Sequence, residues 1–313
     1  MDDRGALARV LRQADDEVLD LLAGLPGADL TTLLLEAMRL RAGKLSAPDV
    51  LRRYRDDRFA TPASVPFGRL RRTEDNALAA LPPEFEVLTL APVAPLGTHS
   101  VLATVDQNKV VSTIRGSEVA ADPTNAMALE AAHRRGGLSD PRSAEVVRLA
   151  ALQRVVRAQR FGGRASFAHF ALLGLVSAGR DTGNLAFERQ HAVEHVRATA
   201  DAVRACGAGR LELRLTVLDP RFSPVVEAIR DALPGVDVVD DPGRESGRGY
   251  YSGFCFKLYC ADGDEWFDVA DGGFVDWTQK LLTNRKERLI ISGVGLDRLA
   301  TLATEPPNAA SAR

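Results

Sequence analysis

The sequence GYYSGFCFKLYC (residues 249–260), followed by DGG (271–273) and LIISGVGLDRL (289–299), decides the fold class of this chain. Its order predicts a strand with a tyrosine pair, a glycine turn, a second strand, and a glycine-spaced turn that leads into a helix. That last turn presents Arg298 from a rigid helix start, and its glycines let backbone and ligand approach closely. The arrangement suits a polyphosphate, so we expect the C-terminal third to hold the functional site.

Length and composition are those of an ordinary globular protein. The 313 residues are 45% hydrophobic and 26% charged, which is enough for one large domain or two modest ones. The net charge of −2 gives no whole-molecule attraction to nucleic acid. Three scattered cysteines are too few for a disulfide framework, and no apolar run approaches the roughly 18 residues of a membrane span. We therefore expect a cytoplasmic protein with no membrane segment.

The chain divides by composition into a helical N-terminal segment, a core and a tail. The expected boundaries are 1–60 for the helical segment, 67–303 for the core and 304–313 for a disordered tail. Apolar periodicity predicts the N-terminal helices. They are expected over 4–24, 30–42 and 46–57.

Within the core, many strands in hairpin-like order alternate with a few long helices. Helices are expected over 67–80, 122–135, 184–206 and 224–233, and strands over 84–95, 101–106, 109–116, 167–178, 211–219, 236–241 and the C-terminal runs quoted above. Residues 143–161 change from helical to extended character. This order predicts an α+β fold with a mixed, mostly antiparallel sheet flanked by helices.

Three blocks of the core resemble, in order, the signature motifs of class II aminoacyl-tRNA synthetases. The helix from residue 67 and the proline-ended strand resemble motif 1, Arg157-Ala-Gln159 with the returning strand FALLGLVSAG (170–179) resembles motif 2, and GVGLDR (293–298) resembles motif 3. The tyrosine-pair strand is most similar to that of the histidyl-tRNA synthetases and their relative, the regulatory subunit of short-form ATP phosphoribosyltransferase. The resemblance covers roughly residues 67–303.

The resemblance implies an ATP site with Mg²⁺, in which Arg157 contacts the α-phosphate and Arg298 the γ-phosphate. Two guanidiniums would neutralise the charge that develops when a carboxylate attacks the α-phosphate. The implied ATP-binding residues are Arg157, Gln159, Gly293, Gly295, Asp297 and Arg298. The implied catalytic residues are Arg157 and Arg248. Motif 1 implies a homodimer through residues 67–95.

The sequence departs from the family pattern at several positions. Gln159 stands where the family has an acid, and Leu172 and Val176 stand where it has the Gln and Glu that hold the substrate ammonium. The position of the family's catalytic arginine is Ser246, so Arg248 or Arg244 would have to substitute. The family also has a polar block, which IRGSEVAADPTN (residues 114–125) matches best. The candidate polar contacts there are Arg115, Glu118 and Asp122. The expected substrate pocket contains Glu118, Leu172, Val176, Tyr250, Tyr251 and Gly253.

These departures leave two functional hypotheses. The first is a stand-alone synthetase-like paralogue with no anticodon-binding domain. It would bind a ligand or regulate a catalytic partner protein, as the related subunit does in histidine biosynthesis, and it would not use tRNA. The second is an active ATP-dependent ligase that adenylates an amino or carboxylic acid other than histidine. The apolar pair Leu172 and Val176 would suit an uncharged or small substrate.

A competing signal is the pattern His191-Ala-Val-Glu194-His195, which matches that of inverted zinc peptidases, with Glu265 as a candidate third ligand. The surrounding residues form an amphipathic helix with solvent-facing charges. Because short patterns of this kind arise by chance, we expect no metal site.

Overall fold

The computed structural model describes residues 3–14, 17–159, 167–233 and 235–302. Its contacts separate two units, one of residues 1–61 with 112–117 and the other of residues 62–111 with 118–313. The expected tail at 304–313 lies outside the described residues. Within the described ranges, none of the helices is long and apolar enough to cross a membrane.

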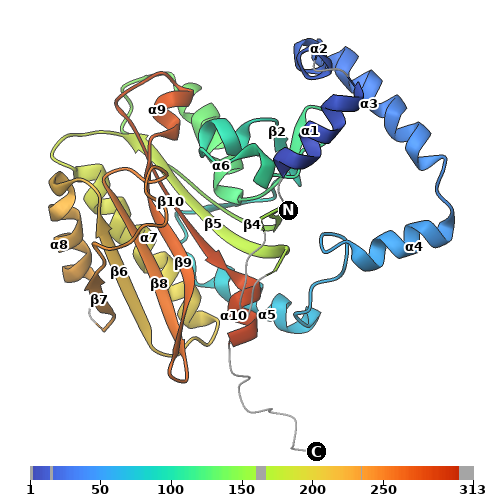
Figure 1. Ribbon diagram of the computed structural model, residues 1–313. Helices are drawn as coiled ribbons and strands as arrows, with labels where there is room; N and C mark the ends of the chain where they lie inside the picture. Colours follow the sequence, from blue (N-terminus) through green and yellow to red (C-terminus); the bar gives the residue numbers. More distant parts are fainter. Residues whose placement is uncertain (1–2, 15–16, 160–166, 234, 303–313) are drawn as a thin grey trace, which may run out of the picture. The chain divides into compact units, whose positions relative to one another are not determined.

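The described residues of the first unit form four helices (Figure 1). They are α1 (Asp3–Ala14), α2 (Val18–Gly24), α3 (Gly27–Ala42) and α4 (Ala47–Asp56). Ser46 and Asp49 form a capping box that starts α4, in which each side chain bonds the other residue's backbone amide. The expected single helix over 4–24 is therefore two helices, and the other two lie where the periodicity predicts them.

The second unit is built on an eight-stranded mixed sheet of order β1-β4-β5-β10-β9-β8-β6-β7. Its strands are β1 (Glu86–Leu88), β4 (Val147–Val156), β5 (His169–Arg180), β6 (Leu211–Val217), β7 (Asp237–Asp240), β8 (Phe254–Asp262), β9 (Glu265–Val275) and β10 (Glu287–Gly295). The two outermost pairs, β1–β4 and β6–β7, are parallel, and all the pairs between them are antiparallel. The expected α+β class with a mixed, mostly antiparallel sheet is confirmed. A separate pair is formed by β2 (Val93–Pro95) and β3 (Ser117–Val119).

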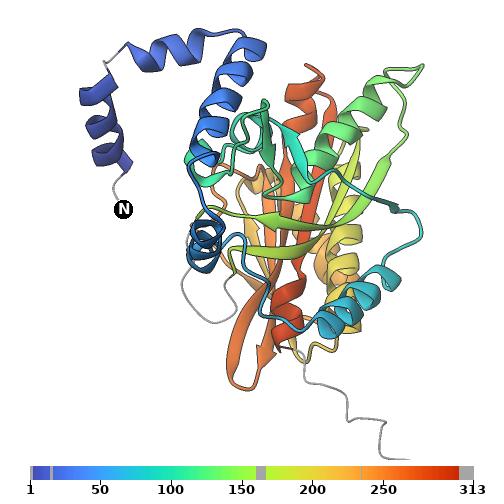
Figure 2. The ribbon, with the colours of Figure 1, turned by 90° about the vertical axis from the view of Figure 1, so that its right-hand side faces the viewer.

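Helices cover both faces of the sheet. One face packs against α5 (Phe67–Ala79), α7 (Ala186–Ala205), α8 (Ser223–Ala232) and α10 (Leu296–Leu302), and the other against α6 (Pro123–Gly136) and α9 (Trp277–Leu281). Strand alternation explains this division, because Leu173 and Leu175 join the first core and Val176 the second. Figure 2 shows α5 in cyan beside α10 in red, and these two helices are in contact.

Two expected strands, 101–106 and 109–116, are wrong. The chain instead forms a π-helical turn at Thr98–Leu102 and a 3₁₀ turn at Gln107–Lys109. The fully buried Glu118 carboxylate accepts hydrogen bonds from the backbone N–H groups of Gly97 (3.1 Å) and His99 (2.7 Å) and from the Gln107 side chain (3.0 Å). These bonds gather residues 97–107 around one carboxylate, so the first of the two segments does not extend. The second turns back on itself, where the Thr113 backbone N–H donates to the Ser117 carbonyl at 2.8 Å.

The tyrosine pair was expected on a strand, and this is also wrong. Tyr250 and Tyr251 lie in the loop before β8, which begins at Phe254. Gly247, Gly249 and Gly253 adopt left-handed φ angles of 85°, 80° and 72°. Glycines at these angles interrupt the extended chain, and the loop therefore turns the tyrosines toward the interior.

A buried ion pair ties the end of α6 to β10. Arg135 donates to both oxygens of Glu287 at 2.9 Å, and the two side chains are only 2% and 3% exposed. Arg135 also donates to the Glu145 carbonyl at 2.6 Å. The pair joins the last turn of α6 to the first residue of β10, so it fixes that end of the helix.

Replacement of Glu287 by alanine should lower the free energy of unfolding by about 3–5 kcal/mol, because it leaves Arg135 buried without a counter-ion. Urea unfolding measures this change. The matched control is Asp75→Ala in the exposed pair with Arg71, which should cost at most about 1 kcal/mol. Equal losses for the two variants would contradict the assignment.

Candidate functional site

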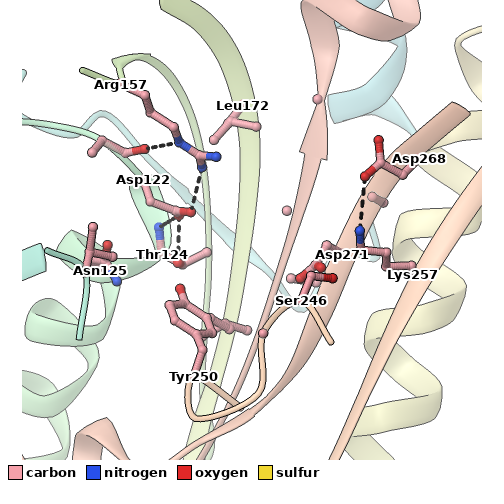
Figure 3. Close-up of a pocket in the computed structure, with 18 of the residues that line it drawn as sticks. Asp122, Thr124, Asn125, Arg157, Leu172, Ser246, Tyr250, Lys257, Asp268 and Asp271 are labelled. Carbon is pink, nitrogen blue, oxygen red and sulfur yellow. Dashed lines mark hydrogen bonds and ion pairs between the residues drawn. The ribbon is translucent and has the colours of Figure 1, made fainter. Parts of the chain in front are cut away.

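A cavity of about 560 Å³ opens on the face of the sheet that carries α6 and α9. Its walls come from the start of α6, the end of β4, the start of β5, the loop before β8, and the middle of β9 and β10 (Figure 3). Among the described residues, five basic and three acidic side chains line it. They are Lys109, Arg157, Arg244, Lys257 and Arg298, with Asp122, Asp268 and Asp271.

The first wall is the N-terminus of α6. Asp122 caps the helix, and its Oδ1 accepts from the Thr124 backbone N–H at 2.9 Å and from the Thr124 hydroxyl at 2.7 Å. A Cβ at Gly174 of β5 would come within 2.8 Å of Pro123, so only glycine allows the helix start to lie this close to the sheet. The close contact places Asp122 in the cavity wall.

Arg157 lies against the same wall. It donates to the Ala121 carbonyl at 3.1 Å and to Oδ2 of Asp122 at 3.3 Å, and its guanidinium lies 5.1 Å from the centre of the Phe170 ring. Figure 3 shows this pair at the top of the cavity. The Arg157 side chain is 34% exposed, so it can move without breaking a buried contact.

Asn125, on the first turn of α6, presents an unsatisfied donor. The Ala121 backbone N–H donates to Nε2 of His99, so Nδ1 of that ring carries the proton and donates to Oδ1 of Asn125 at 2.6 Å. This orients the amide. Its Nδ2 lies beside Tyr250 and influences the pKa of that phenol, yet it has no hydrogen bond of good geometry. Asn125 is 2% exposed, and a buried donor without a partner is costly.

The opposite wall is formed by Asp271 on β9 and the loop before β8. Arg244 donates to Oδ2 of Asp271 at 2.6 Å, and the Tyr251 hydroxyl donates to Oδ1. Arg244 also donates to the backbone carbonyls of Ser246 (2.7 Å) and Phe256 (2.9 Å). Arg244 is 4% exposed as a side chain, whereas Asp271 is 40% exposed. Since Asp271 lies deep in the protein, its exposed surface faces the cavity.

Burial shifts the titration of this wall. It raises the pKa of Asp271 despite the neighbouring Arg244 and Tyr251. Burial also raises the pKa of both tyrosines well above the ordinary phenol value, with the carboxylates of Asp122 and Asp271 adding to the rise at Tyr250. Tyr250 therefore lies within the field of both walls and remains a neutral phenol.

The outer part of the cavity contains Arg298, Asp268 and Lys257. Arg298 donates to the carboxylate and the backbone carbonyl of Asp268, and Lys257 donates to the same carboxylate at 3.2 Å. The Arg298 side chain is 33% exposed. Asp268 is thus paired with two cationic side chains, so this part of the cavity has a net positive charge.

The structure brings most of the expected site residues to one cavity. Those that line it are Arg157, Gln159, Leu172, Tyr250, Tyr251, Gly293, Gly295 and Arg298. Their roles toward a ligand remain predictions.

Six expected site residues lie outside the lining, among them Arg115, which belongs to the first unit. Glu118 holds the turns at 97–107, and Val176 is fully buried beneath α6. Gly253 packs on Phe222, where a Cβ would come within 2.3 Å.

The other two are Asp297 and Arg248. Asp297 is buried and accepts from the Ala171 N–H at 2.6 Å, which anchors the start of α10 to β5. Arg248 donates to the backbone carbonyls of Arg244 and Pro242. Both side chains hold the backbone in place.

Sequence reasoning missed Asp271, Asp268, Lys257, Lys109, His99 and Asn125. Asp271 precedes the glycine pair of DGG and Asn125 ends the DPTN helix start, so position beside those motifs was the available signal. The others carry no local pattern, because their strands and turns meet only in the folded sheet.

The zinc-peptidase pattern forms a buried hydrogen-bond network. Nδ1 of His195 contacts the Ser292 hydroxyl at 2.8 Å, and Nε2 contacts the Ser177 hydroxyl at 3.0 Å. His191 pairs with Glu194. Both His195 nitrogens are thus occupied, and the described residues contain no group of three or more His, Cys, Asp or Glu that could hold a metal ion.

The fold is that of a class II aminoacyl-tRNA synthetase-like core, and solved structures of that class are similar to it. An ATP phosphoribosyltransferase regulatory subunit/histidyl-tRNA synthetase from Bacillus halodurans matches over 78% of this chain and 82% of its own, with a TM-score of 0.60 and 12% identity. A histidine–tRNA ligase subunit from Alicyclobacillus acidocaldarius matches over 77% of this chain and 95% of its own, with a TM-score of 0.59 and 13% identity. Histidyl-tRNA synthetase from S. aureus matches over 75% of this chain and 65% of its own, with a TM-score of 0.57 and 14% identity.

No family model matches the sequence, and no curated protein matches it. At these identities the similarity establishes the fold alone.

Burial lowers the pKa of His195 to about 3, which makes stability depend on pH. In the unfolded chain the imidazole titrates near its ordinary value of about 6.5. As pH falls below that value, the unfolded state gains a proton that the folded state does not, so stability falls. When the pH is lowered from 7.5 to 5.5, the free energy of unfolding of His195→Asn should therefore fall by about 1.4 kcal/mol less than that of the unmodified protein.

Urea unfolding at the two pH values measures this difference. The matched control is His133→Asn, whose imidazole is exposed at the end of α6. The same pH loss in the His195 variant and the unmodified protein would show that His195 does not titrate in this way.

Proposed function

We propose that this chain is a ligand-binding protein of synthetase-like fold that regulates a catalytic partner protein and does not charge tRNA. The observation that carries the proposal is that both arginines expected at the phosphates are paired with carboxylates of the cavity. Arg157 is paired with Asp122, and Arg298 is paired with Asp268. An adenylating site needs these guanidiniums on ATP, so each pair would first have to open.

The ligand that fits this charge pattern is a small amino acid-like compound. Asp122 can accept an ammonium when Arg157 turns to the ligand's carboxylate, and the unsatisfied Nδ2 of Asn125 offers that carboxylate a second donor. Leu172, near the start of β5, supplies an apolar contact. A zwitterion would therefore exchange one internal ion pair for two intermolecular ones.

The partner is proposed from one similar protein, the ATP phosphoribosyltransferase regulatory subunit/histidyl-tRNA synthetase from Bacillus halodurans. We propose a homodimer through residues 67–95, where Phe67, Val87 and Val93 are 82%, 51% and 41% exposed. The proposed location is the cytoplasm, in keeping with three free cysteines.

The second candidate is an ATP-dependent adenylate-forming ligase. It is favoured by the convergence of Arg157, Arg298 and Lys109 on one cavity, which matches the charge of a triphosphate. Mg²⁺ bound to a nucleotide takes one or two carboxylates. Each carboxylate of this cavity is already paired with a basic side chain, so the residues fit phosphates better than they fit Mg²⁺.

ATP–pyrophosphate exchange over a panel of amino and carboxylic acids separates the two candidates. The regulatory proposal expects no exchange with any acid, and calorimetry should still detect binding of an amino acid. If exchange occurs, Arg298→Ala should reduce it by about 100-fold or more, as expected for a lost phosphate contact. The surface variant Arg230→Ala, which breaks an exposed pair with Asp240, is the control.

The regulatory role is tested with a short catalytic ATP phosphoribosyltransferase. The two purified proteins should form a complex at micromolar concentration, and the rate of the catalytic protein should change on mixing. The Arg230→Ala variant should behave like the unmodified chain. The absence of a complex and of any change in rate would contradict this role.

A further inference from the structure

The cavity contains two arginine–aspartate pairs that differ in how firmly the arginine is held. Arg157 is 34% exposed and contacts one backbone carbonyl besides its carboxylate, which lies 3.3 Å away. Arg244 is 4% exposed, donates to two backbone carbonyls and contacts its carboxylate at 2.6 Å. A ligand can therefore displace Arg157, whereas Arg244 stays with Asp271.

This difference decides what each carboxylate can accept. When Arg157 moves away, the charge of the Asp122 carboxylate is no longer neutralised, and Asp122 can bind an ammonium. Asp271 remains neutralised by Arg244, and Lys257 occupies the strand position directly opposite it. A second cation at Asp271 would meet like charge. The carboxylate oxygens still have lone pairs free, because each accepts one bond in the structure.

An independent feature indicates that a ligand belongs between these walls. The Asn125 side chain is nearly fully buried and lines the cavity, yet its Nδ2 has only a poorly aligned contact with Tyr250. Its orientation is fixed by His99, so the amide cannot flip to satisfy itself. A well-aligned acceptor atom, such as a carboxylate oxygen of a bound amino acid, would complete the hydrogen bonding of this amide.

We propose that Asp271 determines ligand specificity by accepting a hydrogen bond from an uncharged donor, such as a carboxamide, in the side chain of an α-amino acid. Arg244 is the positioning residue that keeps this carboxylate in place and neutral overall. The inference rests on the proposed function, in which Asp122 binds the ammonium group of the amino acid. A site built to bond a polar group rejects analogues that lack it.

Calorimetric titration with matched pairs of L-amino acids tests the proposal. Glutamine and asparagine carry the neutral donor, glutamate and aspartate an anion, lysine and ornithine a cation, and norleucine and norvaline no polar group. The unmodified protein should bind the first pair at least tenfold more tightly than each of the others. Asp271→Asn should reverse the order of glutamine and glutamate, because it leaves Arg244 without its anion.

Asp240→Asn, an exposed carboxylate outside the cavity, is the matched control and should keep the original order. If Asp271→Asn does not fold, Tyr251→Phe provides the second test. It removes one of the two groups that hold the carboxylate and should reduce the ratio of glutamine to norleucine affinity at least threefold.

The outcomes separate the inference from the proposed function. Tighter binding of lysine than glutamine, or an unchanged order in Asp271→Asn, overturns the role of Asp271 and leaves the amino-acid ligand standing. An unchanged ratio in Tyr251→Phe does the same. Binding of none of the eight amino acids overturns the proposed ligand class, and the role of Asp271 with it.

Discussion

The close packing of α6 on the sheet is the constraint on which the rest of this core depends. Gly174 allows Pro123 to lie against β5 at one end of the helix, and the buried pair of Arg135 and Glu287 holds the other end. A helix fixed at both ends cannot shift along the sheet. Its capping carboxylate, Asp122, and its first-turn amide, Asn125, therefore have fixed positions in the cavity wall before any ligand arrives.

The electrostatics of the cavity follow from this geometry. In the part of the chain that the structure describes, each carboxylate that lines the cavity is paired with an arginine that also lines it. Internal pairing lowers the cost of holding so many charges in a partly enclosed space. It also means that a ligand competes with existing contacts, so selectivity depends on which pair can open. The exposure of Arg157 and Arg298, near one third, sets them apart from Arg244.

The sequence predicts the sheet well where apolar runs are long. Strands β5, β6 and β10 lie where periodicity and the glycine-spaced motif place them, because each is buried over most of its length. The prediction fails where one residue reorganises its neighbours. Glu118 gathers the expected strand 101–106 into turns, and left-handed glycines turn the tyrosine pair out of β8. Such effects depend on contacts or φ angles that composition does not reveal.

The candidate site was predictable to a smaller extent. Arg157 and Arg298 were located by motif, but their carboxylate partners lie 35 and 30 residues away in sequence and become visible only in the fold. Leu172 and Val176 are four residues apart on one strand and so share a face. Only Leu172 lines the cavity, since the packing of α6 at Gly174, between them, covers Val176.

The loop before β8 shows how a small backbone change alters the chemistry available to the cavity. Its two candidate arginines flank Ser246, and the left-handed Gly247 decides between them. A Cβ at Gly247 would come within 3.0 Å of the Tyr251 ring and 3.2 Å of Arg244, so glycine lets those two side chains pack together. Arg248 consequently turns to backbone carbonyls, and Arg244 enters the wall beside Asp271. A cation in that position is fully occupied by protein groups, which suits it to orienting a carboxylate and not to stabilising charge on a reacting phosphate.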